Sequence, residues 1–177
     1  MSTHKKEPNP TLPDMRFRQS LYFYQEQFSQ LPAADESSSA GDYHAAFVGP
    51  AWLRAGCAWS MPFIGLPGWR GKRLSGKGKA ANLCRALCIR SDDESSVLQE
   101  RCVMNVQADR SVTDGRPVLS LNYTEPSTPW LLRHFRDELR QWDENTILAY
   151  AVIRLPWLNR FMKPICLPFV LSRHSSG

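Results

Sequence analysis

A phosphate-binding pattern is the first candidate for chemistry in this sequence. Residues 71–77 read GKRLSGK, which matches G-x-x-x-x-G-K. In a P-loop, Ser or Thr follows the lysine and binds magnesium, and the loop joins a strand of a parallel sheet to a helix. Gly78 stands where that Ser or Thr is needed, and the flanking residues predict no such strand and helix. We therefore expect neither nucleotide hydrolysis nor a bound cofactor.

Carboxylates and histidines do not form a recognisable catalytic set either. Asp137 and Glu138 are adjacent, as are residues 143 and 144, but neighbours on a helix point in different directions and do not share a proton. His134 precedes Asp137 by three residues and could act as a base, although a partly exposed helical histidine is the commoner situation. No serine lies in a G-x-S-x-G elbow. These residues favour a protein that is not an enzyme.

The cysteines indicate a compartment more than a site. The chain has five, an odd number, and their spacing is not that of a zinc site. Cys84 and Cys88 could form a metal or redox pair, but buried thiols in a reducing cytoplasm are the favoured interpretation. No secretory signal and no apolar run long enough to cross a bilayer is present. We expect a cytoplasmic protein without a metal.

Basic residues are concentrated in the first half of the chain. Between residues 43 and 90 there are eight Lys or Arg and no Asp or Glu, in a chain of net charge +5. Such a segment could contact nucleic acid, an anionic membrane or a ligand carboxylate, or form a solvated loop. Trp59, Phe63 and Trp69 lie among these bases, as in a base-stacking surface. However, no nucleic-acid-binding motif is present, so nucleic acid is a less favoured partner than a weakly contacted membrane surface.

The elements that would position these residues are mainly strands. The 177 residues predict a loose tail over 1–13 and a single domain over 14–177. Within it, Asp14 could cap an amphipathic helix whose apolar stripe runs from Phe17 to Leu31.

Strands are expected over 43–48, 82–90, 97–108, 117–123, 146–154 and 165–173, with Asp114 and Gly115 in a tight turn. Residues 129–142 have apolar side chains at helical spacing and are expected to form a second helix, with a strand end as the alternative. This order predicts an antiparallel β-barrel.

A family resemblance supports the same architecture. Residues 68–72, GWRGK, resemble the G-x-W-x-G-K signature of bacterial lipocalin-like families that have no assigned function. Further segments are similar to those families in the same order, at residues 27–32 (QFSQLP), 43–54 (YHAAFVGPAWLR), 65–72, 123–150 and 167–173 (LPFVLSR). The resemblance covers roughly residues 27–173. It implies a calycin-like barrel that holds a hydrophobic ligand.

A barrel of this kind assigns roles to particular side chains. We expect Trp69 to close the barrel floor by stacking on Arg136 or Arg140. Lys72, Asn82, Tyr123 and Arg136 are the polar residues expected to point inward and orient a ligand. The predicted function is binding of a small lipophilic molecule with an acidic or hydroxyl head. The alternatives are a barrel enzyme acting on a lipophilic substrate, and a binder of nucleic acid or of an anionic membrane surface.

Overall fold

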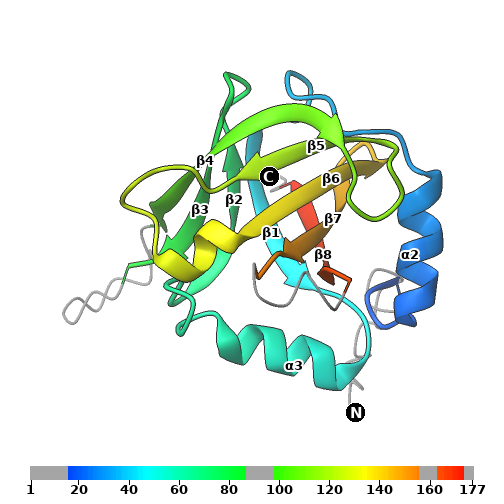
Figure 1. Ribbon diagram of the computed structural model, residues 1–177, viewed down its shortest axis with the longest axis horizontal. Helices are drawn as coiled ribbons and strands as arrows, with labels where there is room; N and C mark the ends of the chain where they lie inside the picture. Colours follow the sequence, from blue (N-terminus) through cyan, green and yellow to red (C-terminus); the bar gives the residue numbers. More distant parts are fainter. Residues whose placement is uncertain (1–15, 87–97, 156–162, 174–177) are drawn as a thin grey trace, which may run out of the picture.

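The protein forms a closed barrel of eight antiparallel strands (Figure 1). The computed structural model describes residues 16–86, 98–155 and 163–173. Each strand pairs with the next along the chain, and the last pairs with the first. The strands are β1 (Gly41–Phe47), β2 (Trp69–Leu74), β3 (Lys79–Arg85), β4 (Leu98–Arg110), β5 (Pro117–Asn122), β6 (Phe135–Asp143), β7 (Thr146–Ile153) and β8 (Ile165–Arg173). The predicted fold class is confirmed.

Helix α2 (Leu21–Gln30) packs on the outside of the barrel (Figure 1). Ser20 caps it, because its hydroxyl accepts a hydrogen bond from the Phe23 amide at 3.2 Å. Tyr24 and Phe28 are buried and pack against residues of β5, β7 and β8. Tyr24 and Phe28 of the predicted apolar stripe are therefore buried as expected, but the helix begins at Leu21, which is exposed, and Phe17 precedes it. The predicted cap Asp14 lies outside the described residues.

A second helix, α3 (Ala51–Ser60), lies across one end of the barrel (Figure 1). It was not predicted, because the sequence after Gly41 indicated only strands and turns. Leu53 and Cys57, one turn apart, face the protein. The other side of the helix is also apolar, so the contrast between faces that marks an amphipathic helix is missing.

The pattern GKRLSGK belongs to β2 and to the tight turn that leads into β3, where Gly76 and Gly78 have φ values of 68° and 73°. It is not the loop between a strand and a helix. Gly71 is required by a close approach: a Cβ atom at this position would lie 1.8 Å from the Tyr43 carbonyl oxygen in β1. The second glycine of the G-x-W-x-G-K pattern thus allows β2 to pair tightly with β1.

The helix predicted over residues 129–142 is wrong for most of its length. A short 3₁₀ helix, η1 (Trp130–His134), is followed directly by strand β6. Phe135 and Leu139 are four residues apart, a spacing that fits one face of a helix and equally one face of a strand. The strand alternation was hidden because the inward residue between them is Asp137, and because the outward residues Glu138 and Arg140 are also buried.

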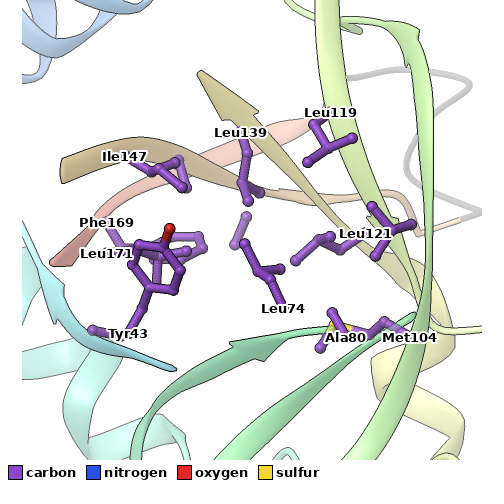
Figure 2. Packing of buried hydrophobic residues seen from close by; sticks show 14 of the residues in the cluster. Tyr43, Leu74, Ala80, Met104, Leu119, Leu121, Leu139, Ile147, Phe169 and Leu171 are labelled. Atoms are coloured by element: carbon purple, nitrogen blue, oxygen red, sulfur yellow. The ribbon is translucent and has the colours of Figure 1, made fainter. Parts of the chain in front are cut away.

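The barrel interior is the main hydrophobic core (Figure 2). Met104 and Val106 of β4 and Leu119 and Leu121 of β5 contribute to it, so the buried face of these strands is apolar. β4 is irregular near Cys102, which has a φ of 50°, and the β3–β4 register shifts there. No helix within the described ranges is long and apolar enough to cross a membrane.

Candidate functional site

A cavity of about 90 Å³ lies inside the barrel at the end covered by α3. Most of its wall is apolar and comes from the strands, from η1 and from the residues in and after α3. The polar side chains in the lining are Ser60 of α3 and four that point into the barrel, Lys72, Asn82, Tyr123 and Asp137. These four come from β2, β3, the end of β5 and β6, so the antiparallel topology brings together residues that are far apart in the sequence.

Lys72 is the centre of this polar cluster. Its side chain is 2% exposed, and its ammonium lies 2.8 Å from Asp137 Oδ2, whose side chain is 4% exposed. The ammonium also donates to Asn82 Oδ1 at 2.8 Å and to the Tyr123 hydroxyl at 3.2 Å. An ammonium group has three hydrogens, and the third hydrogen-bond partner here is the Met104 sulfur at 3.7 Å, while Asp137 is in ion-pair contact. Lys72 therefore has no spare donor for a ligand.

Asn82 ties the cluster to Trp69. Its Oδ1 accepts from both Lys72 and the Trp69 indole, the latter at 3.0 Å, and its Nδ2 donates to the Tyr123 hydroxyl at 3.1 Å. Trp69 also packs between Phe47 and Phe169, with ring centroids 5.3 Å and 6.0 Å away. The tryptophan is held by aromatic packing and by a hydrogen bond, which fixes the orientation of the amide beneath it.

The electrostatics of the cluster are those of a neutral pair. Burial alone would lower the pKa of Lys72, but the Asp137 carboxylate and Tyr123 outweigh it and raise that pKa above its ordinary value. Burial raises the pKa of Tyr123 to about 12, although Lys72 opposes the shift. At neutral pH the cluster therefore holds an ammonium and a protonated phenol beside a carboxylate.

Two groups in the cluster retain hydrogen-bonding capacity. The Tyr123 oxygen accepts from two donors, and its own hydrogen has only a long contact of 3.5 Å to Asn82 Oδ1. Asp137 Oδ2 contacts Lys72 as an ion pair but receives no hydrogen bond of good geometry from the described residues. One donor and one acceptor are thus available within the cluster.

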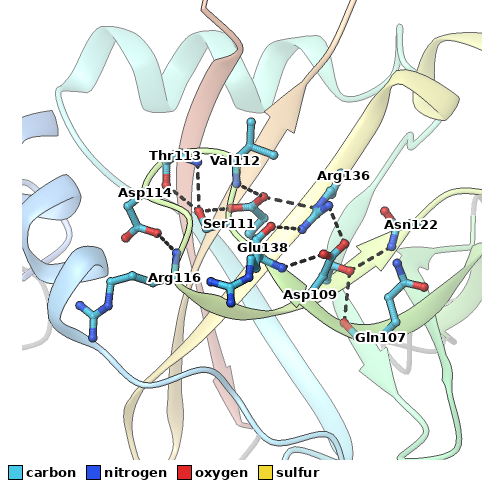
Figure 3. Close-up of polar contacts among 12 residues, drawn as sticks. Gln107, Asp109, Ser111, Val112, Thr113, Asp114, Arg116, Asn122, Arg136 and Glu138 are labelled. Atoms are coloured by element: carbon cyan, nitrogen blue, oxygen red, sulfur yellow. Dashed lines mark hydrogen bonds and ion pairs between the residues drawn. The ribbon is translucent and has the colours of Figure 1, made fainter.

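Arg136 does not point inward as predicted. Residues alternate along β6, and since Phe135 and Asp137 line the cavity, Arg136 lies on the outer face (Figure 3). There its guanidinium donates to Asp109 at 2.9 Å and to the Arg110 carbonyl at 2.8 Å, and it lies 3.3 Å from Glu138. Arg136 therefore belongs to a polar network outside the barrel.

Arg140 is also outside, under α2. It forms a bidentate pair with Asp114 at 2.8 Å for both bonds, donates to the carbonyls of Phe28 and Pro117, and lies 4.3 Å from the centroid of the Phe28 ring. The predicted stacking of Trp69 on Arg136 or Arg140 is therefore wrong: Lys72 is the cation near Trp69, 5.8 Å from its ring centroid. Arg140 instead joins α2 to the β4–β5 turn.

Sequence reasoning missed Asp137, the partner of the buried lysine. It was considered only on a predicted helix, as a neighbour of Glu138 and as an acid three residues after His134. In a strand the two carboxylates point to opposite faces, so Asp137 enters the barrel while Glu138 accepts bonds from Ser111 and from the Val112 amide on the outside. The strand parity set by Phe135 and Leu139 would have identified it.

The basic side chains of residues 70–79 lie on both sides of the barrel wall. Lys72 points inward, whereas Arg73 pairs with Asp42 and Glu100 on the outer surface. Lys79 pairs with Glu125 at 2.9 Å. Much of the positive charge that the sequence concentrates in residues 70–79 is therefore matched by acids from elsewhere in the chain.

No metal centre is found among residues 16–86, 98–155 and 163–173, where no three His, Cys, Asp or Glu side chains form a suitable group. Cys57, Cys84, Cys102 and Cys166 are free thiols in this part of the chain. Burial raises the pKa of the Cys84 thiol, which disfavours the thiolate that a metal would need. Cys88, considered above as its partner, lies outside the described residues.

Comparison with known proteins supports the fold. No family model matches the sequence, and no curated protein matches it. Among solved structures, the chain is similar to the crystal structure of a protein from Thermomonospora curvata, with a TM-score of 0.62, 13% sequence identity and coverage of 89% of each chain. Identity this low shows a shared fold alone. The resemblance to lipocalin-like families is thus supported as barrel architecture, and no particular family is established.

Proposed function

We propose that the barrel binds a slender lipophilic molecule that carries a hydroxyl head. The observation that carries the proposal is the cavity itself, with apolar walls and a neutral cluster of buried polar groups (Lys72, Asn82, Tyr123 and Asp137) in its lining. Ligand sites commonly combine an apolar lining with a few convergent polar groups that fix orientation. The lipocalin-like barrel fold is compatible with this use.

The volume of the cavity limits the shape of the ligand. About 90 Å³ corresponds to several water molecules, at roughly 10–15 Å³ for each. Such a space takes the head and the first few carbons of a single alkyl chain, and the rest of a longer chain would lie beyond the cavity. Removal of the chain from water contributes roughly 25 cal/mol per Å² of apolar surface.

The free hydrogen-bonding capacity selects the head. An alcohol can donate its hydrogen to the Asp137 carboxylate and accept one from the Tyr123 hydroxyl, which matches the two groups left unsatisfied. A carboxylate head would lie beside Asp137, and Lys72 has no donor left for it. Burial of that uncompensated negative charge is costly. We therefore narrow the predicted acidic or hydroxyl head to hydroxyl.

We do not propose catalysis at this cluster. A lysine acts as a nucleophile or base only when deprotonated, and Asp137 holds Lys72 in its charged form by raising its pKa. With a pKa of about 12, Tyr123 is a poor acid at neutral pH. The cluster is suited to holding a polar group in place.

A titration with matched probes tests the proposal. Decan-1-ol and decanoate have the same chain and differ in the head, so their dissociation constants at neutral pH compare the heads directly, by calorimetry or tryptophan fluorescence. We expect saturable binding of decanol, at least about tenfold tighter than decanoate. Absence of saturable binding by both probes would contradict the function, and tighter binding of decanoate would contradict the proposed head.

A pair of tyrosine variants locates the binding site. Tyr123→Phe removes the hydroxyl donor from the cavity, whereas Tyr150→Phe removes one beneath α2, on the other side of the barrel wall. Only Tyr123→Phe should weaken decanol, by about tenfold, with its melting temperature followed in parallel. Equal effects of the two variants would show that decanol does not bind at the cluster.

A further inference from the structure

Helix α3 presents an apolar face to solvent. Trp52, Trp59 and Phe63, the last just beyond the helix, are 69%, 73% and 70% exposed. The rings of Trp59 and Phe63 are in contact, with centroids 4.8 Å apart. The remaining exposed residues of the helix are Ala51, Ala55, Gly56 and Ala58, so no charged side chain interrupts this face. Contiguous exposed apolar surface of this kind marks an interaction site.

The apolar face continues onto the neighbouring turn and 3₁₀ helix. Gly65, after α3, lies against Pro129, which directly precedes η1. The first residue of η1 is Trp130, whose side chain is also exposed. We refer to Trp52, Trp59, Phe63 and Trp130 together as the aromatic face.

Exposed arginines lie at the same end of the barrel. Arg70 follows Trp69 at the start of β2, Arg85 ends β3 with its amide bonded to the Gly68 carbonyl at 2.8 Å, and Arg133 lies in η1. All three are exposed, and residues 43–86 contain no Asp or Glu. The aromatic face is therefore flanked by positive charge.

We propose that the aromatic face docks the protein on the surface of an anionic lipid bilayer. Trp and Phe favour the boundary between head groups and acyl chains, and arginines beside them attract anionic lipid. The contact would be interfacial, with α3 lying along the membrane. A second copy of the chain is the competing occupant, but a two-fold contact through this face would bring the flanking arginines of both copies together.

The position of the face connects docking to the cavity. Cys57, Ser60 and Met61, on the inner side of α3 and at its end, line the cavity, while the outer side carries the exposed tryptophans. Docking would place the cavity end of the barrel against lipid. The inference rests on the surface alone, and it holds whether or not the cavity takes a ligand.

Vesicle binding tests this proposal directly. Wild-type protein is mixed with vesicles of phosphatidylcholine alone and of phosphatidylcholine with phosphatidylglycerol, and bound protein is measured by co-sedimentation and by quenching of tryptophan with brominated lipid. We expect binding to the anionic vesicles at least about tenfold stronger than to the neutral ones, weakening with added salt. Failure to bind either vesicle would overturn the proposal.

Matched variants show which surface binds. Trp52→Ser with Trp59→Ser and Phe63→Ser removes three of the four residues of the aromatic face, and Tyr22→Ser removes an equally exposed aromatic from α2. The triple variant should lose vesicle binding by about tenfold or more, and Tyr22→Ser should not. A separate variant, Arg70→Gln with Arg85→Gln, should reduce the preference for anionic lipid. If the triple variant melts at lower temperature, Trp52→Ser alone replaces it. Equal loss in the Tyr22→Ser control would overturn the assignment of the surface.

Self-association is measured on the same samples. Sedimentation velocity of the wild type without lipid should show no dimer whose formation depends on the aromatic face. A dimer that the triple variant abolishes, together with absence of vesicle binding, would assign the face to a second copy of the chain instead.

Discussion

The Lys72 ammonium lies 2.8 Å from the Asp137 carboxylate inside the barrel, with both side chains almost fully buried. The pair links β2 to β6 across the interior, and Asn82 and Tyr123 accept hydrogen bonds from Lys72 and are bonded to each other. Since the charges cancel, the cavity has polar groups but no net charge. This arrangement governs both the ligand that the cavity would accept and the stability of its variants.

Breaking this pair from one side should be more harmful than replacing both partners. Lys72→Met leaves the Asp137 carboxylate buried without a cation and is expected to reduce the free energy of unfolding by about 3–5 kcal/mol. Adding Asp137→Leu removes that charge and should restore most of the loss. Urea unfolding of the two single variants and the double variant measures the coupling. Strictly additive losses would contradict the ion pair.

Gly71 should tolerate no side chain. In Gly71→Ala the new Cβ would lie 1.8 Å from the Tyr43 carbonyl, so β1 and β2 must separate and the variant should lose at least about 3 kcal/mol of stability. Gly56→Ala is the matched control, since nothing lies within 4 Å of a Cβ there and alanine favours the helix. The control should gain about 0.5–1 kcal/mol. Thermal or urea unfolding compares them, and equal stabilities would refute this role for Gly71.

The stabilising effect of Asp114 should depend on pH. Burial would raise the pKa of its carboxyl, but the hydrogen bonds from Arg140 outweigh this and lower it below the ordinary value. The stabilisation is therefore complete above the pKa of the unfolded chain and is lost as pH falls through the lower folded value. At neutral pH, Asp114→Asn should cost about 1.5–3 kcal/mol. In strongly acidic solution the difference from wild type should disappear.

Asp143 provides the control for that measurement. Its carboxylate is exposed and lies 3.4 Å from an exposed Arg16, so Asp143→Asn should change stability by less than about 1 kcal/mol. Urea unfolding across the acidic range compares both variants with wild type. A penalty for Asp114→Asn that is the same at neutral and acidic pH would contradict the assigned role of the carboxylate.

Filling the cavity should abolish ligand binding without removing the polar cluster. Ala151 lines the cavity from β7, and Ala151→Phe places a ring in the space proposed for the alkyl chain. Decanol should bind at least about tenfold more weakly, while the cost in stability stays near 1–3 kcal/mol. Ala46→Phe adds the same ring to the outer groove bordered by α3 and β1 and should leave decanol affinity unchanged. Calorimetry distinguishes them, and unaltered binding in Ala151→Phe would place decanol elsewhere.

Local sequence predicts six of the eight strands, and it misses β2 and β6. Alternation of apolar and polar residues in β4 and β5, the Asp114–Gly115 turn and the bounds of β8 are visible in local sequence because each strand has one dry face. The motif order around Trp69 indicated the same architecture. Lys72, Asn82 and Tyr123 were expected in the cavity because the resemblance to ligand-binding barrels implies a few inward polar groups.

Local sequence gave wrong predictions where the polarity of a side chain did not match its burial. α3 is apolar on its exposed side, so no contrast between faces marked it as a helix. In β6 the inward Asp137 and the buried outward Arg140 reverse the usual pattern, and the strand was interpreted as a helix. Asp137 is paired with Lys72 and Arg140 with Asp114, and both partners are too distant in sequence to appear in a local pattern.

The surface that each charged side chain faces depends on how distant strands pair. A shift of one residue along a strand exchanges the inside of a barrel for the outside. That parity sends Arg136 to the outer network with Asp109 and brings Asp137 to Lys72. Local sequence indicates a basic protein with the strand pattern of a barrel, in which Lys72 is expected to be a free cation. Closure of the sheet brings β2, β3, β5 and β6 around one cavity. Lys72 therefore meets Asp137 there and forms a neutral pair.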